Sequence, residues 1–449
     1  MDQKLTHASP TNTKWWKKTV IYSTYVDKFA GNFAKMTEKL DYLSLLGIDC
    51  VHILPFYPSP FVDDGYDICD YCAVRKELGT LDDFSKFIAG AHQRGIRVII
   101  DLVLNHTSTQ HPWFLEASAS PESPKRNFYL WSKNQNEFSD AENPFSMLKS
   151  SNWIASPTSD DYYFSTFYPE QADLNWNNTE VFAAMMGVID FWVARGVDGF
   201  RLDAAAHLIK KAGTDCVNLP ETHIVIKRIR AYLDQHHVGV VLLGEANGRD
   251  SLSAIKTYFG DNDECHLMYE FPLVGKLFLA LKRNDRTVLA PILAESANIP
   301  EDTQWVTLLR HHDEMPLTCL PPDEKQEVFD YFDAEKKYIF NLGTSLRTAT
   351  AFKGEHRDIL RAFEMLFSVP GSPIIYYGDE IGMENIALET NERDTRRAVR
   401  GTFDWEQAHR QTSDPESLFS GIAKIIKNWK GIELEHSAFS QMELPASAE

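Results

Sequence analysis

The sequence lacks the features that would place the protein in a membrane or on nucleic acid. No run of residues approaches the roughly 18 apolar residues that a membrane-spanning helix needs. The N-terminal segment MDQKLTHASPTNTKWW is polar and has no apolar core of the signal-peptide kind. Basic side chains are in the minority, 45 against 64 acidic ones, which gives a net charge of −19. We therefore expect a cytoplasmic protein whose main partner is neither a nucleic acid nor an anionic membrane.

Cysteine is also sparse, with six residues scattered over 449. Only Cys69 and Cys72 have the two-residue spacing of a redox or zinc pair. No second cysteine pair or histidine pair follows at metal-site spacing, so free thiols are expected and no metal site is predicted from these residues.

The chain alternates short apolar runs with stretches of helical periodicity. Thr80, with Asp83 three residues later, begins one such helix as a capping pair. Eight apolar runs are predicted as buried parallel strands, at residues 20–25, 50–54, 97–102, 199–203, 240–245, 265–271, 305–309 and 373–377. Alternation of this kind predicts an α/β protein with a TIM (β/α)8 barrel, which needs only roughly 250 residues.

The alternation is interrupted once. Between residue 106 and about residue 174 the chain is rich in Ser, Asn, Pro and aromatic residues, and this stretch is too long for a barrel loop. The predicted organisation is a first part of the barrel at 1–105, an inserted small domain after the third strand at 106–174, the remainder of the barrel at 175–432, and a tail at 433–449.

Reactive side chains stand where predicted strands end, and barrel enzymes place their active sites at that end. Taken singly, each has a structural explanation, because an acidic residue after a strand often caps the next helix. Arg201 and Asp203 are likewise compatible with a structural ion pair. The whole set favours a function, because it collects three carboxylates, an arginine and two histidines at one rim: Asp203, Glu245, Asp313, Arg201, His106 and His312.

These residues lie in motifs that resemble those of the α-amylase family of retaining glycoside hydrolases and transglycosylases (glycoside hydrolase family 13). The resemblance extends from Trp15 to Trp429. Eight motifs follow one another in order: GIDCVHILP (47–55), GYD (65–67), DLVLNH (101–106), QADLNW (171–176), GFRLD (199–203), GEAN (244–247), HHDE (311–314) and GSPIIYYGDEIGM (371–383).

The resemblance implies a role for each of the three carboxylates. Asp203 would attack the anomeric carbon and form a covalent glycosyl intermediate. Glu245 would protonate the leaving oxygen and then deprotonate the acceptor, and Asp313 would grip sugar hydroxyls and favour the distorted ring. Such chemistry needs one carboxylate that is ionised and one that holds a proton at neutral pH.

Other site residues follow from the same resemblance. Arg201 would keep Asp203 charged by lowering its pKa. His106 and His312 would donate hydrogen bonds to sugar hydroxyls, and Tyr66 would stack on the sugar ring at the cleavage site.

The size of the pocket depends on a predicted ion pair. Asp67 of the GYD motif would pair with Arg400, with Arg396 or Arg397 as alternatives. The pair would block longer chains and favour maltose, trehalose or sucrose as the small-molecule substrate. A solvated basic cluster on a loop is the structural alternative, because four arginines lie between residues 393 and 400.

Two branches of the family compete. GTDCVNLPETH (213–223), YFGDNDECH (258–266) and PFYPSPFVDDGYDICDY (55–71) resemble trehalose synthases, which interconvert maltose and trehalose. YVDKFAGN (25–32), QADLNW and the segment 394–417 are more similar to amylosucrases and sucrose hydrolases. We expect an enzyme of small α-glucosides that is closest to trehalose synthase. The alternatives are an amylosucrase-like or sucrose- or maltose-hydrolysing α-glucosidase, and a truncated, non-catalytic barrel.

The sequence departs from the family at several places, which include Ala172 in place of the Pro or Trp often found in the QADLNW motif. His311 stands where both branches usually have Asn or Ser. The Asp- and Gly-rich calcium loop of many trehalose synthases is absent, so no cofactor is expected, and Asn105 and Asp173 are the candidates for a structural calcium site. The β-sandwich of about one hundred residues that normally follows the barrel is missing from the sequence. The oligomeric state is not indicated.

Overall fold

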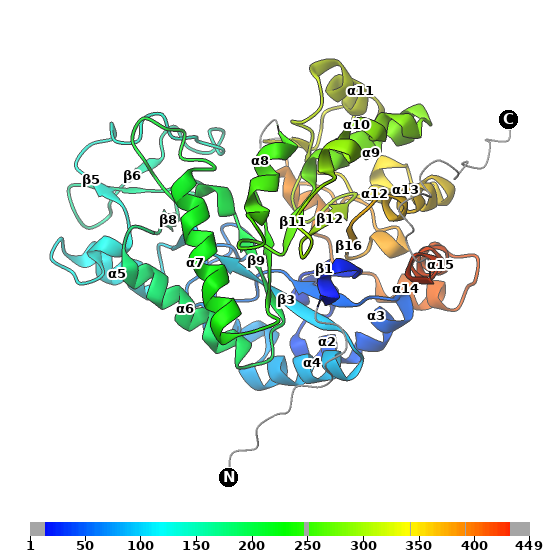
Figure 1. The fold of residues 1–449 in the computed structure, drawn as a ribbon, viewed down its shortest axis with the longest axis horizontal. Coiled ribbons are helices and arrows are strands. Elements are labelled where there is room, and N and C mark those ends of the chain that lie inside the picture. The colour runs from blue at the N-terminus through cyan, green and yellow to red at the C-terminus, as the bar shows by residue number, and fades with distance from the viewer. Residues whose placement is uncertain (1–13, 247–250, 342, 391, 432–449) are drawn as a thin grey trace, which may run out of the picture.

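A closed barrel of eight parallel strands forms the centre of the molecule (Figure 1). The computed structural model describes residues 14–246, 251–341, 343–390 and 392–431. Around the barrel the strands follow in the order β1 (Ile21–Thr24), β2 (Cys50–Ile53), β3 (Arg97–Val103), β9 (Gly199–Asp203), β10 (Val241–Gly244), β11 (Leu267–Tyr269), β12 (Gln304–Leu308) and β16 (Ser372–Tyr376), which closes on β1. The predicted fold is confirmed, and each predicted strand region overlaps one of these strands.

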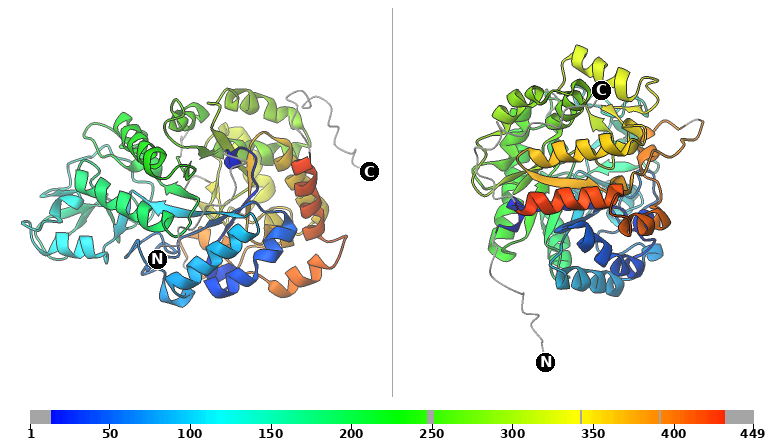
Figure 2. Two further views of the ribbon diagram at one scale, coloured as in Figure 1. Left: turned by 60° about the horizontal axis from the view of Figure 1, so that its bottom comes forward. Right: turned by 90° about the vertical axis from the view of Figure 1, so that its right-hand side faces the viewer.

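Helices form a layer around the barrel (Figures 1 and 2). Thr80 and Asp83 make the predicted capping box at the start of α4. Helix α13 packs beside α15, as Figure 2 also shows. The main helices are α2 (Phe33–Glu38), α3 (Leu40–Leu46), α4 (Leu81–Gln93), α6 (Thr179–Val193), α7 (Pro220–His236), α8 (Leu252–Lys256), α9 (Phe271–Arg283), α10 (Ala290–Ser296), α13 (His356–Ser368), α14 (Trp405–Thr412) and α15 (Leu418–Gly431).

The end of α3 shows why the residue that follows it is a glycine. Gly47 has φ +95°, in the left-handed region that glycine adopts without steric cost. A Cβ atom at this position would lie 2.9 Å from Ile426 of α15. Gly47 therefore both ends α3 and lets α15 approach it closely.

The inserted region lies between β3 and α6 and projects from one side of the barrel (cyan in Figure 1). It contains α5 (Pro112–Ala119), a pair of antiparallel strands, β4 (His106–Ser108) with β8 (Gln171–Asp173), and a small sheet of β5 (Trp131–Ser132), β7 (Tyr162–Phe164) and β6 (Trp153–Ala155). The domain boundaries stay predictions, and the predicted tail at 433–449 lies outside the described residues.

A second excursion, which the sequence did not predict, separates β12 from α13. We call its described residues, 309–341 and 343–355, the β12–α13 excursion. It contains α11 (Pro322–Phe332), α12 (Thr348–Ala351) and a three-stranded sheet of β13 (Met315–Pro316), β15 (Gly343–Thr344) and β14 (Ile339–Phe340).

Lys210 ties the inserted region to the barrel. Its ammonium group lies 2.7 Å from Asp173 Oδ2 and 2.9 Å from Asn105 Oδ1, and it also donates to the carbonyl of His207. Burial raises the pKa of Asp173, but Lys210 and hydrogen bonds from Thr166 outweigh this and hold that pKa below its ordinary value. The two candidate calcium ligands of the sequence therefore both contact a buried lysine.

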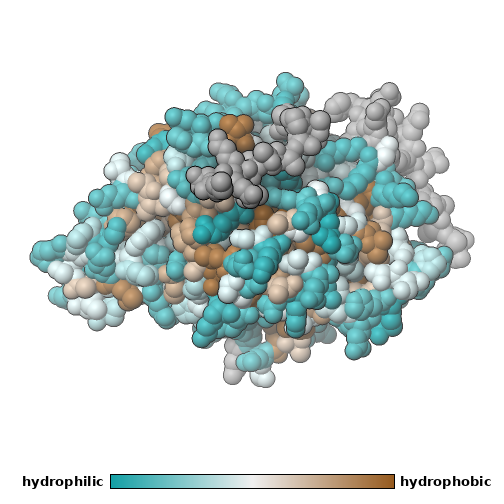
Figure 3. Space-filling view, turned by 90° about the horizontal axis from the view of Figure 1, so that it is seen from below, coloured by the Kyte–Doolittle hydropathy of each residue, from teal (hydrophilic) through white to brown (hydrophobic). Residues whose placement is uncertain are grey.

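The surface and the cysteines can be described from the same structure. On the face shown in Figure 3, hydrophobic side chains form small patches separated by hydrophilic ones, apart from the area drawn in grey. No helix in the described ranges is long and apolar enough to cross a bilayer. Cys69 and Cys72 are free thiols.

We predict that Lys210→Met destabilises the protein by about 3–5 kcal/mol, because it leaves the buried Asp173 carboxylate without its partner. Chemical denaturation followed by circular dichroism measures the effect. Lys424→Met, which changes an exposed lysine on α15, is the control. Because a lysine contacts both candidate calcium ligands, EDTA should leave the unfolding midpoint of the unchanged protein where it is. Equal midpoints for the two variants, or a midpoint lowered by EDTA, would contradict this account.

Candidate active site

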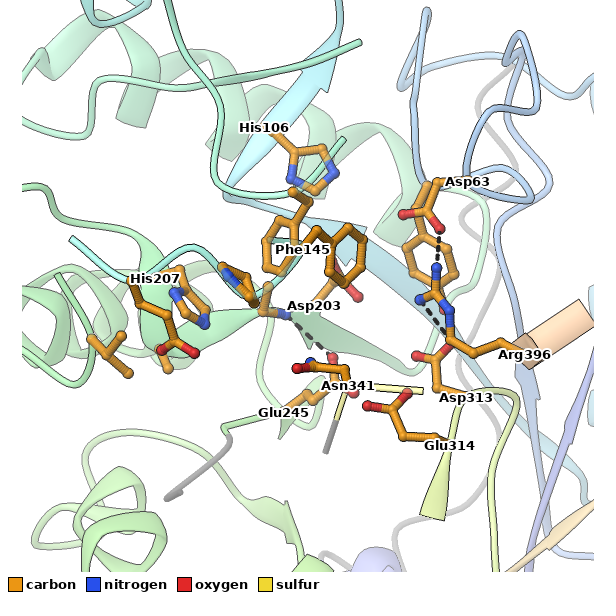
Figure 4. A pocket seen from close by; sticks show the side chains of 17 residues that line it. Asp63, His106, Phe145, Asp203, His207, Glu245, Asp313, Glu314, Asn341 and Arg396 are labelled. Carbon is orange, nitrogen blue, oxygen red and sulfur yellow. Dashed lines mark hydrogen bonds and ion pairs between the residues drawn. The ribbon is translucent and has the colours of Figure 1, made fainter. Parts of the chain in front are cut away.

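The barrel brings the three predicted carboxylates to one rim. Asp203 ends β9, Glu245 follows β10 directly, and Asp313 follows β12. Parallel pairing keeps these strand ends level, since the Glu245 amide donates to the Leu202 carbonyl at 3.1 Å. A pocket opens at this rim, and its walls include Tyr66, His106, Asp203, Glu245, Asp313 and Arg396 (Figure 4). The structure therefore assembles residues that are far apart in the sequence.

Arg201 lies between the two carboxylates expected to do the chemistry. Its side chain is fully buried, with Nη1 2.9 Å from Asp203 Oδ1 and Nη2 2.6 Å from Glu245 Oε2. It also forms an ion pair with the buried Asp101. Ala204, directly after the nucleophile candidate, has φ +47° and donates its amide to Glu245 Oε2 at 3.3 Å. One guanidinium and one strained backbone residue therefore fix both carboxyl groups.

The net effect on Asp203 differs from the sequence prediction. Burial raises the pKa of Asp203 well above its ordinary value. The charge of Arg201 lowers this pKa, as predicted, but Glu245 and Asp101 add to the rise. The effect of Arg201 is present and is outweighed.

The predicted sugar-binding side chains differ in position. Tyr66 and His106 line the pocket, and His106 Nε2 is buried without a hydrogen-bond partner among the described residues. Burial lowers the pKa of His106 to about 4, so its imidazole is neutral near pH 7. His312 stacks on Tyr66 at 5.3 Å between centroids and hydrogen-bonds to its hydroxyl at 2.8 Å. It therefore supports Tyr66 from behind, and its donation to a sugar hydroxyl stays a prediction.

Asp313 is held by three cationic or hydrogen-bonding groups. Arg396 Nη1 lies 3.2 Å from its Oδ1, Arg400 contacts the same oxygen, and His312 Nε2 lies 3.2 Å from its Oδ2. Burial raises the pKa of Asp313, but His312 and the two arginines outweigh this and hold it well below the ordinary value. Asp313 is therefore ionised and fixed in place.

The predicted ion pair between Asp67 and Arg400 is wrong. Asp67 is fully buried and accepts hydrogen bonds from the Ser59 hydroxyl at 2.7 Å and the Val62 amide at 2.9 Å. Its carboxylate is used to hold the loop at residues 59–67 together, so it does not reach the arginine.

The two preceding aspartates pair with the arginines instead. Arg400 forms its ion pair with Asp64, and Arg396 lies 3.0 Å from Asp63 Oδ1. Arg396 also forms a 2.6 Å ion pair with Asp394. The loop thus forms two Asp–Arg pairs rather than the single one predicted, and the pair of Asp63 with Arg396 lines the pocket. The alternative of a solvated basic cluster is also wrong for these two arginines, which are buried.

Several pocket residues were missed by the sequence reasoning. Phe145 and Phe167 come from the inserted region, and Glu314 and Asn341 from the β12–α13 excursion. Burial raises the pKa of Glu314 to about 7. Of these four residues, only Glu314 could have been predicted from the sequence, because it belongs to the HHDE motif. Phe145, Phe167 and Asn341 lie in segments without a periodic pattern.

One group in the described chain, His311, His312 and Asp313, has metal-ligand atoms within 4.8 Å of one another. However, Asp313 already contacts two guanidinium groups, which repel a further cation. The arrangement therefore fits an anchored carboxylate better than a metal site.

Comparison with known proteins places this geometry in a family. The family model for the alpha-amylase catalytic domain matches residues 9–419. Trehalose synthase/amylase TreS of Mycolicibacterium smegmatis is 41% identical over 98% of this chain and 74% of its own length. Trehalose synthase of Pimelobacter sp. is 38% identical over 97% of this chain and 78% of the relative. Oligo-1,6-glucosidase of Heyndrickxia coagulans is 32% identical over 85% and 69%.

Solved structures show the same fold. The trehalulose synthase MutB superimposes with a TM-score of 0.74 at 24% identity, over 93% of this chain and 85% of that one. From the matching family model and the extent of these similarities, the chain is an enzyme of the α-amylase family, glycoside hydrolase family 13.

Proposed function

We propose that this enzyme acts on small α-glucosides through a covalent glucosyl intermediate on Asp203 and interconverts maltose and trehalose. The observation that carries the proposal is the placement of Asp203 and Glu245 on the same buried guanidinium, with the ionised Asp313 on the wall of the same pocket. The relatives called trehalose synthase, 38–41% identical over nearly the whole chain, support the choice of substrates.

Two steps complete the reaction on maltose. Asp203 attacks the anomeric carbon while Glu245 gives its proton to the glycosidic oxygen, so that glucose is released with its 4-hydroxyl restored. The released glucose turns in the pocket and presents its anomeric hydroxyl. Glu245 takes that proton, the bond to Asp203 breaks, and the α,α-1,1 linkage of trehalose forms. Retention follows from the two successive displacements at one carbon.

The two Asp–Arg pairs support a small substrate. They lie beside Asp313, with Asp63, Arg396 and Arg400 buried and Asp64 partly exposed, and we infer that they close the pocket beyond the sugar that Asp313 would contact. A neutral disaccharide fits this site because Asp63, Asp313 and Arg396 of its wall are already paired with one another.

A hydrolysing α-glucosidase is the second candidate. The 32% identity to an oligo-1,6-glucosidase favours it, and water would intercept the same intermediate with the same carboxylates. Sucrose as substrate remains the amylosucrase-like alternative from the sequence, and a cytoplasmic location stays a prediction.

We predict that maltose and trehalose are converted into each other with little free glucose, because the cleaved glucose is retained in a closed pocket. Chromatography of separate incubations with maltose, trehalose and sucrose measures this. Glucose alone from maltose would make the enzyme a hydrolase. Fructose from sucrose would instead place it with the amylosucrases, and turnover of none would support a non-catalytic barrel.

We predict that Asp203→Asn lowers kcat on the order of 10⁴-fold or more, as loss of an essential catalytic group does. Glu245→Gln should still react with α-glucosyl fluoride, because fluoride leaves without a proton. Mass spectrometry should then show one glucosyl unit on Glu245→Gln and none on Asp203→Asn. An adduct on the Asn variant would contradict the assignment, and circular dichroism checks that both variants are folded.

We predict an acid limb of kcat/KM at a pH above the ordinary aspartate pKa of 3.8. The nucleophile acts only when ionised, so a raised pKa makes activity disappear at a higher pH as the pH falls. Rates with α-glucosyl fluoride isolate this limb, because that substrate needs no acid. Samples held at each pH and assayed near pH 7 separate titration from unfolding. A limb at or below 3.8 would contradict the raised pKa.

A further inference from the structure

Two phenylalanines from distant parts of the chain meet at the pocket wall. The rings of Phe145 in the inserted region and Phe340 in β14 lie 5.6 Å apart and nearly perpendicular, at 78°. The guanidinium carbon of Arg396 lies 5.3 Å from the centre of the Phe145 ring and 4.6 Å from that of Phe340. We call Phe145, Phe340 and Arg396 the aromatic seam.

The seam forms part of the pocket wall where the inserted region meets the β12–α13 excursion. Phe145 and Arg396 line the pocket, as Figure 4 shows, whereas Phe340 is 3% exposed and packs behind them. On its other side the Arg396 guanidinium contacts Asp313 and Asp63. The Arg396 side chain therefore contacts both the two phenylalanine rings and the ionised carboxylates of the pocket.

Two hydrogen bonds hold the same segments together. The Tyr168 hydroxyl of the inserted region donates to Asp394 Oδ2 at 2.9 Å. The Thr395 hydroxyl donates to the Tyr338 carbonyl at 2.9 Å, which fastens β14 to the segment that carries Arg396. Phe340 therefore packs against both Phe145 and Arg396, and these hydrogen bonds tie together the segments that carry the three side chains.

Two reactions compete for the glucosyl intermediate on Asp203. In each, the bond from the anomeric carbon to Asp203 breaks, and a new bond forms to the oxygen of a glucose hydroxyl or of water. Glu245 accepts the proton in both cases. The ratio of the two products therefore depends on whether glucose is retained and water is kept out.

We propose that the aromatic seam sets this ratio and that Phe340 is a positioning residue for it. Phe340 holds Phe145 and Arg396 in place and closes the wall between the inserted region and the β12–α13 excursion. This inference rests on the proposed function, since it concerns the fate of the same intermediate.

The test compares Phe340→Ala with Phe332→Ala. Phe332 lies in the same excursion, is also buried, and contacts Phe278 and Phe352 but neither Phe145 nor Arg396. The measurement is the initial ratio of free glucose to trehalose formed from maltose. Both products come from one intermediate, so the ratio does not depend on how much of each variant is folded.

Phe340→Ala should raise the ratio about fivefold or more, Phe340→Leu should raise it less, and Phe332→Ala should leave it unchanged. An unchanged ratio in Phe340→Ala, or an equal rise in Phe332→Ala, would overturn the inference. If Phe340→Ala does not fold, the test uses Phe340→Leu: a raised ratio of glucose to trehalose supports the inference, and an unchanged ratio overturns it.

A further measurement distinguishes failure of this inference from failure of the proposed function. A wild-type enzyme that forms glucose but no trehalose would disprove the isomerisation. Labelled glucose added as acceptor would then still report the partition between transfer and hydrolysis. If the aromatic seam keeps water from the intermediate, Phe340→Ala should shift this partition toward hydrolysis and Phe332→Ala should leave it unchanged. No shift in Phe340→Ala would overturn the inference in this case too.

Discussion

The buried guanidinium of Arg201 is the interaction on which the site depends. Removing an arginine and several carboxylates from water costs several kcal/mol for each ion unless they are paired well. Here one fully buried cation contacts Asp101, Asp203 and Glu245 at the rim of the barrel. The barrel strands supply the rigid frame that holds these groups at fixed positions. The two carboxyl groups that the chemistry needs are therefore placed before any substrate arrives.

Two further buried arginines extend this charge pairing to the surrounding segments. Arg396 and Arg400 meet at Asp313, and each also pairs with an aspartate of the loop after β2. Four separate stretches of chain converge here: that loop, the inserted region, the β12–α13 excursion and the segment at residues 394–400. Charge pairing thus joins parts that the barrel alone does not hold together, and the pocket closes where they meet.

The sequence predicted the barrel well because buried parallel strands leave apolar runs, and strand-end carboxylates stand out after them. The prediction failed where the pairing partner of a side chain depends on how a loop turns. In the segment VDDGYD three aspartates lie within five residues, and no periodicity tells which one faces an arginine; the structure buries Asp67 and presents Asp63 and Asp64. Lys210 was missed for the same reason, since its contacts with Asn105 and Asp173 are long-range. Phe145 and Phe340 lie in segments without a regular pattern.

In this fold, the catalytic carboxylates and the walls of the pocket come from different parts of the chain. Strand β9 carries Asp203, β10 directly precedes Glu245, and Asp313 lies in the loop that follows β12; every reaction proposed uses these three carboxylates. The inserted region and the β12–α13 excursion carry the walls, including Phe145, Asn341 and Glu314. Relatives called trehalose synthase and oligo-1,6-glucosidase both align with most of this chain, although their names indicate different products. In the proposed mechanism, selectivity that resides in the walls can change while the three carboxylates stay constant, because the walls determine what meets the proposed intermediate and the carboxylates determine how it forms.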